Sequence, residues 1–256
     1  MSWITYTITM NTSEKAWFDE WFDTTYYHIL YQQRNDDEAH FFIDNLARFL
    51  QFSPSDNLLD LACGKGRHAI YLNSKGLQVI GVDLSANSIA HASLVGNERL
   101  HFERHDMRDI YKPNYFDYVL NMFTSFGYFD TDAENQATIS AAADNLKVGG
   151  KLVLDFFNAV KIINNLVDYE QKTLNDITFT ITKRFSSNFI LKNIHFVVNE
   201  QHFHFQEKVQ AISLHQFETY FKKANFNILH TFGGYDLTEF DLYSSDRLIF
   251  IVEKHA

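Results

Sequence analysis

Cysteine and proline are scarce in this chain of 256 residues, which has one cysteine, Cys63, and two prolines. A single thiol excludes an intrachain disulfide, as expected for the reducing conditions of the cytoplasm. It also leaves a zinc site without cysteine partners. Cys63 lies in a glycine turn, and nothing around it in the sequence indicates the activating environment that a nucleophilic thiolate needs. We therefore expect a cytoplasmic protein in which Cys63 serves packing.

Long apolar runs and excess positive charge are also missing. No run approaches the roughly 20 residues of a membrane span, and the first residues lack the pattern of a signal peptide. The net charge of −10 disfavours non-specific attraction to nucleic acid or to an anionic membrane. The chain is instead rich in aromatic residues, with 25 phenylalanines and 13 tyrosines. This composition predicts an aromatic core or pocket and a small-molecule partner, and it leaves the oligomeric state open.

The stretch Asn57–Leu84 has the pattern of a strand, a glycine turn, a helix and a second strand. The first apolar run contains Asp60, the turn contains Gly64 and Gly66, and the second run ends at Asp83. Two parallel strands joined by a crossover helix place both carboxyl ends at one edge of the sheet. Ligands of open α/β sheets bind at that edge. We therefore expect the two acids and the turn to form a binding site.

Two ligand classes fit this arrangement. Gly64–Ala69 matches G-x-G-x-x-A, the dinucleotide fingerprint, which is a weak signal by itself. The stretch resembles more closely the first motif of the Rossmann-like S-adenosylmethionine-dependent methyltransferases, in which an acid closes the first strand before G-x-G-x-G. Here Asp60 is that acid, and Ala62 replaces the first glycine ahead of Gly64 and Gly66. A carboxylate can hold the ammonium group of this cofactor but would repel a pyrophosphate.

The resemblance implies roles for five further residues near the cofactor. Asp83 would accept hydrogen bonds from the ribose hydroxyls, and Leu84 would pack on the adenine. Asp106 would accept from the adenine amino group while Met107 supplies a backbone donor, although Asp106 could instead only cap its turn. Asn121 would offer an amide to the methionine portion.

The N-terminal segment resembles the helical lid of small-molecule methyltransferases, and residues 1–50 are expected to form it. The resemblance implies that Tyr27 and Tyr31 face the substrate pocket and that Arg34 pairs with the cofactor carboxylate. Phe123 and Phe157 are further candidates for the pocket wall, with ordinary core packing as the alternative. A second helix of this segment is expected at Glu38–Leu50, capped by Asp36 or Asp37.

We expect an α/β fold with a doubly wound, seven-stranded, mostly parallel sheet whose last strand is antiparallel. Residues 51–158 and 213–256 would form this core. Residues 159–212 would form a small inserted antiparallel sheet, with strands at Thr173–Arg184, Phe189–Val198 and Gln201–Ile212 and a hairpin turn at Asn199–Glu200.

Histidines cluster in the expected insertion, where His202 and His204 share one face of a strand and His195 lies on the strand before. A metal site would need further ligands in register. We therefore expect an exposed or partly stacked histidine group and no metal.

These features predict a methyltransferase that uses S-adenosyl-L-methionine and acts on a small molecule by in-line transfer, with an amine as the favoured acceptor. The alternatives are an NAD-dependent oxidoreductase and a non-catalytic protein that binds S-adenosylmethionine. No catalytic base stands out, because His28, His68, Tyr27 and Tyr31 are all candidates and geometry must decide among them.

Overall fold

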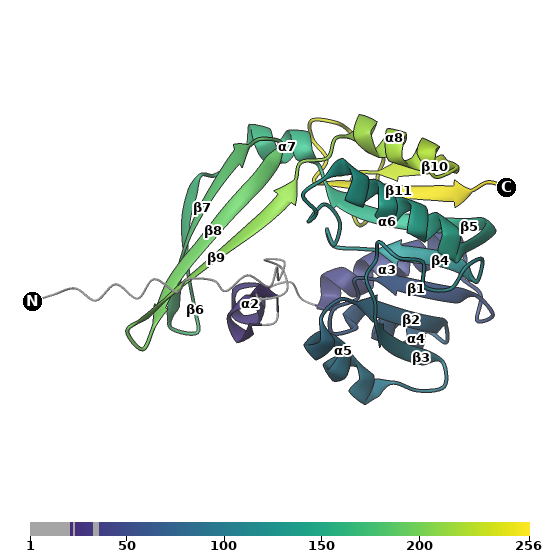
Figure 1. Cartoon of the computed structure of the whole chain (residues 1–256), viewed down its shortest axis with the longest axis horizontal. Coiled ribbons are helices and arrows are strands. Elements are labelled where there is room, and N and C mark those ends of the chain that lie inside the picture. The colour runs from purple at the N-terminus through teal and green to yellow at the C-terminus, as the bar shows by residue number, and fades with distance from the viewer. Residues whose placement is uncertain (1–20, 23, 33–35) are drawn as a thin grey trace, which may run out of the picture.

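The computed structural model describes residues 21–22, 24–32 and 36–256. A seven-stranded sheet with the order β10-β11-β5-β4-β1-β2-β3 forms the centre of the molecule (Figure 1). Strands β1 to β5 pair in parallel, and β11 is antiparallel to both of its neighbours, so the expected fold class is confirmed. The strands are β1 Asn57–Leu61, β2 Gln78–Asp83, β3 Leu100–Arg104, β4 Phe116–Asn121, β5 Leu146–Phe157, β10 Phe226–Phe232 and β11 Arg247–Lys254.

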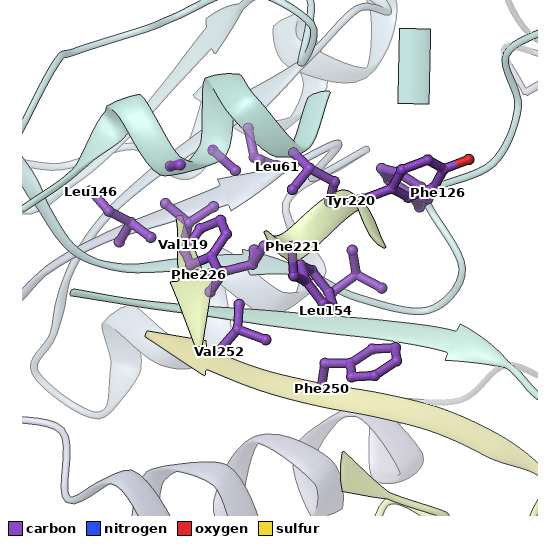
Figure 2. Packing of buried hydrophobic residues seen from close by; sticks show 14 of the residues in the cluster. Leu61, Val119, Phe126, Leu146, Leu154, Tyr220, Phe221, Phe226, Phe250 and Val252 are labelled. Carbon is purple, nitrogen blue, oxygen red and sulfur yellow. The ribbon is translucent and has the colours of Figure 1, made fainter. Parts of the chain in front are cut away.

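Helices cover both faces of this sheet because successive side chains of a strand point to opposite sides. Leu58 packs with α3 and α4 on one face, whereas its neighbour Leu59 packs with α6 and α8 on the other. Figure 2 shows the second layer, where Phe221 of α8 and Phe250 of β11 belong to one buried cluster. The helices are α3 Asp36–Leu50, α4 Arg67–Ser74, α5 Ala86–Ala92, α6 Asp132–Asn145 and α8 Leu214–Lys223, with the short 3-10 helix η1 at Ser93–Val95.

A separate four-stranded antiparallel sheet follows β5 and the short helix α7 Ala159–Asn164, and it extends away from the large sheet (Figure 1). We call it the inserted sheet. Each of its three two-residue turns has positive φ at both residues, as type I′ hairpins require. The turn at Asn199–Glu200 was expected. The turn at Asn175–Asp176 was not, so the single strand predicted at Thr173–Arg184 is wrong. The strands are β6 Tyr169–Leu174, β7 Ile177–Ser186, β8 Phe189–Val198 and β9 Gln201–Gln210.

Polar contacts fasten the inserted sheet to the core at the end of β9. The backbone nitrogen of Gln210 donates to the carbonyl of Gly127 at 2.8 Å. The side chain of Gln210 is nearly buried, and it donates to Asp132 at 2.7 Å and accepts from Asn135 of α6. The side chain and the backbone of one residue therefore join β9 to two segments of the core.

Residues 21–22 and 24–32 form what we call the lid segment, which contains helix α2 Thr25–Leu30. Figure 1 shows α2 between the inserted sheet and the large sheet. Trp21 and Leu30 are buried in one cluster with Phe179 and Phe196 of the inserted sheet. The next helix, α3, begins at Asp36, two residues before the expected start, so that three acids lie in its first turn near the positive end of the helix dipole.

Replacing Phe250 by alanine is expected to lower the free energy of unfolding by about 3–5 kcal/mol, because the ring is fully buried and packs against Phe217 and Phe221. Chemical denaturation measures this change. Leu94→Ala is the control, since Leu94 is 80% exposed and its truncation should change stability by no more than about 0.5 kcal/mol. Equal losses in the two variants would contradict the assigned core.

Candidate active site

A cavity of about 440 Å³ opens at the carboxyl ends of the parallel strands, beneath the lid segment. Its lining comes from the turns after β1, β2, β3 and β4 and from the lid segment. The structure thus brings together residues that are far apart in the sequence, as the topology of an open parallel sheet predicts. The predicted residues that line it are Ala62, Gly64, Asp83, Leu84, Asp106, Met107, Tyr27, Tyr31 and Phe123.

The turn after β1 contains three residues with left-handed backbone conformation. Ala62 has φ 59°, Gly64 has φ 55° and Gly66 has φ 83°. Gly66 does not line the cavity; it begins helix α4, and a Cβ there would lie 2.6 Å from the ring of Phe102. Ala62 stands where the related motif has glycine, and its side chain makes this conformation unfavourable by roughly 1 kcal/mol.

The carboxylate of Asp83 connects this turn to the end of β2. Its Oδ2 accepts from the backbone nitrogen of Gly64 at 2.8 Å, and its Oδ1 accepts from that of Ser85 at the same distance. A carboxylate oxygen can accept more than one hydrogen bond. Since Asp83 also lines the cavity, its carboxylate is placed to contact a ligand there.

Asp60 and Asn121 are buried on the neighbouring strands β1 and β4 and do not line the cavity. Burial raises the pKa of Asp60 to about 7, and the charge of Asp83 adds to this effect. Within the described part of the chain, Oδ2 of Asp60 and Oδ1 of Asn121 accept no hydrogen bond. The amide nitrogen of Asn121 donates to the carbonyl of Leu61 at 3.1 Å. Two buried acceptors of this kind fit a ligand that carries several N–H donors.

Asp106 lines the cavity and also holds its own turn. Burial raises the pKa of Asp106, but hydrogen bonds from Arg108 outweigh burial and hold the pKa below its usual value. The backbone nitrogen of Arg108 donates to Asp106 at 2.9 Å, and its guanidinium donates at 2.6 Å. Asp106 therefore stays ionised at neutral pH. The turn-capping role that the sequence left open is present, and the place of Asp106 in the lining leaves it able to contact a ligand.

A second cavity of about 340 Å³ lies beside the first, between the lid segment, the inserted sheet and β5. The predicted Phe157 lines this cavity, together with Lys192 and Glu207 of the inserted sheet, for which the sequence pattern gives no signal. Strand periodicity shows which residues share a face, but it does not show that the face meets a cavity. The wall common to both cavities consists of Phe22, Tyr27, Tyr31, Phe123 and Tyr128.

His68 is one of the candidate bases, and its surroundings perturb it strongly. Its ring stacks on Phe123 with 4.8 Å between centroids, and burial lowers the pKa of His68 to about 3, so the imidazole is neutral at pH 7. Burial raises the pKa of the Cys63 thiol far above neutrality, which keeps the sulfur protonated.

Further predictions concern the histidine cluster, membrane spans and Arg34. In the histidine cluster, His195 Nε2 lies 3.1 Å from His202 Nδ1, and its ring stacks on His204. Across the described residues, no group of three or more histidine, cysteine or acidic side chains is placed to hold a metal ion. The described helices include none that is long and apolar enough to span a membrane. Arg34 lies outside the described residues.

Part of the chain is similar in sequence to known methyltransferases. Residues 58–150 match the family described as "Methyltransferase domain". A dTDP-3-amino-3,4,6-trideoxy-alpha-D-glucopyranose N,N-dimethyltransferase of Streptomyces venezuelae is 33% identical over 102 residues, which span 40% of this chain and 42% of that relative, less than half of its length.

Solved structures resemble the chain over nearly its whole length. An S-adenosylmethionine-dependent methyltransferase of Clostridium acetobutylicum has a TM-score of 0.77 at 19% identity and covers 90% of this chain and 96% of its own. The amino pentose methyltransferase CalS10 of Micromonospora echinaspora, solved with S-adenosylmethionine bound, has a TM-score of 0.70 at 20% identity and covers 90% and 97%. The fold is therefore the class I methyltransferase fold.

Replacing Asp60 by asparagine is expected to remove a pH dependence of stability. Because the pKa of Asp60 rises from about 4 in the unfolded chain to about 7 in the folded one, the ligand-free protein loses stability as pH rises from about 4 to 7. The loss is on the order of 3–4 kcal/mol. Denaturation of both proteins between pH 4 and 8 measures it, with Asp144→Asn on the exposed side of α6 as control. A constant difference between wild type and Asp60→Asn would contradict the prediction.

Ala62→Gly is expected to raise the free energy of unfolding by roughly 0.5–1 kcal/mol. Glycine removes the cost of a left-handed alanine, and this gain is partly offset by the greater freedom of glycine in the unfolded chain. Thermal and chemical denaturation give the change. The matched substitution Ala137→Gly within α6 should lower stability by about 1 kcal/mol, and the same sign at both positions would refute the assigned strain at Ala62.

Proposed function

We propose that the chain uses S-adenosylmethionine to methylate an amine of a small molecule, because residues 58–150 match the methyltransferase domain family and the fold is that of the class I methyltransferases. The observation that carries the proposal is the aromatic wall between the two cavities. One cavity touches the glycine turn and Asp83, where the cofactor belongs, and the other is large enough for a small acceptor. The wall is then the place where the methyl group passes between them.

The residues of the first cavity fit the three parts of the cofactor. Asp83 would accept from the ribose hydroxyls, and Leu84 and Met107 would contact the adenine. Asp60 and Asn121 lie buried behind this lining, each with an acceptor without a hydrogen bond in the described residues, and would reach the ammonium group through a bridging water. A bound ammonium favours the ionised form of Asp60, so cofactor binding would lower the pKa of this residue.

The bound cofactor supplies a methyl group on a positively charged sulfur, so the protein mainly has to align the acceptor and exclude water. Tyr27, Tyr31 and Phe123 surround the junction of the cavities, and aromatic faces stabilise a nearby cation by about 0.5–2 kcal/mol. Both the sulfonium and a protonated amine are such cations. His68 stays neutral beside this wall, and because burial lowers its pKa to about 3 it is a weak proton acceptor.

An amine of a small molecule is favoured over other acceptors on two grounds. A neutral amine needs less help from a base than a hydroxyl does. The Streptomyces relative is named as an N,N-dimethyltransferase of an amino sugar, and we extend the amino group, without the identity of the sugar, to this chain. Residues 1–50, together with the inserted region 159–212, would then enclose the acceptor over the core formed by residues 51–158 and 213–256.

Calorimetric titration with S-adenosylmethionine, S-adenosylhomocysteine and NAD tests the cofactor. We expect both adenosyl ligands to bind, and Asp83→Ala to weaken them roughly 30- to 100-fold through loss of about 2–3 kcal/mol. Asp144→Asn is the control for removal of an acid. Release of S-adenosylhomocysteine in a panel of amines then tests turnover. Binding of NAD alone would refute the proposal, and tight binding without turnover of any amine would indicate a protein that only binds the cofactor.

A further inference from the structure

One carboxylate of the inserted sheet holds both flanks of the lid helix. Glu207 of β9 accepts from the indole nitrogen of Trp21 at 2.8 Å and from the hydroxyl of Tyr31 at 2.6 Å. Trp21 precedes α2, and Tyr31 is its C-terminal cap. A single side chain therefore fixes the position of the helix from both ends.

The surroundings of Glu207 make these bonds stronger than typical surface contacts. Its side chain and that of Lys192 are each 15% exposed, and the ammonium lies 3.4 Å from the carboxylate. Lys192 also donates to the hydroxyl of Tyr31 and lies over the face of its ring, 4.6 Å from the centroid. Hydrogen bonds to a charged partner are stronger than bonds between neutral groups.

Tyr31 connects the hydrogen bonds of Glu207 to the two cavities. Tyr31 lines both cavities, as does Tyr128 on the core side. The hydroxyl of Tyr128 donates to the carbonyl of Thr124 at 2.6 Å, within its own loop. Tyr31 instead hydrogen-bonds to the inserted sheet. The lid half of the aromatic wall thus depends on Glu207, whereas the core half is held by its own backbone.

We propose that Glu207 is a positioning residue for methyl transfer, acting through Tyr31 to hold the lid segment across the cofactor cavity. The inference rests on the proposed function, because it takes the first cavity to be the cofactor site. Loss of the anchor frees Tyr31 and the lid segment, so a bound cofactor product leaves faster. Because the anchored residues lie over the cavity rather than at its base, the effect falls mainly on the dissociation rate.

A double-mutant cycle with S-adenosylhomocysteine as the probe tests this role. Glu207→Gln and Tyr31→Phe each remove the charged hydrogen bond between the two residues. We expect each to raise the dissociation rate about 10-fold, and the double variant to be close to either single variant, because both remove the same interaction. Glu170→Gln is the matched control, since Glu170 pairs with Lys183 on the same sheet at 2.7 Å, and it should dissociate at the wild-type rate.

Each outcome separates this inference from the proposed function. Wild-type rates in both single variants would overturn the role of Glu207, as would effects that multiply in the double variant, because Glu207 would then not act through Tyr31. Failure of the wild-type protein to bind the probe would instead overturn the proposed function and, with it, the inference. Thermal denaturation of every variant checks that the chain is folded, and Glu207→Gln conserves the shape of the side chain for that reason.

Discussion

The hydrogen bond from the backbone nitrogen of Gly64 to the Asp83 carboxylate is the interaction on which the site depends. It holds the turn after β1 against the end of β2, and it requires the turn to present Gly64 with its nitrogen toward Asp83. The left-handed conformation of Ala62 follows from that path. The same charge adds to the effect of burial, which raises the pKa of Asp60. One carboxylate therefore shapes the cavity floor and favours the protonated form of the acid beneath it.

Much of this site can be predicted from the sequence, because its signals are local. Apolar runs that end in acids, separated by glycines and a short helical pattern, are enough to place Asp60, Gly64 and Asp83 at one edge of the sheet. The roles within the edge are less predictable. Gly66 packs against Phe102 instead of lining the cavity. Asn121 lies behind the cavity, and its amide nitrogen donates to the carbonyl of Leu61.

The inserted region shows the opposite case. Polar and apolar residues alternate clearly along its strands. The turn at Asn175–Asp176 was nevertheless predicted to be part of one strand, because two residues barely interrupt this alternation. The contacts of Glu207 are harder still, since its partners Trp21 and Tyr31 are 186 and 176 residues away. Sequence periodicity predicts on which face of a strand a side chain lies, but only the tertiary structure shows which residues contact that face. The part of the molecule that would select the acceptor is thus the part that the sequence describes least.

Because the inserted sheet is attached to the core at Gln210, a rotation about this point would move its far end the most. A ten-residue strand is about 33 Å long, so a rotation of about 5° at the base would move the far hairpins by roughly 3 Å. Glu207 lies three residues from Gln210, about 10 Å along the strand, and would move by only about 1 Å. Any rotation about this attachment would therefore displace the residue that holds the lid segment far less than it displaces the far hairpins.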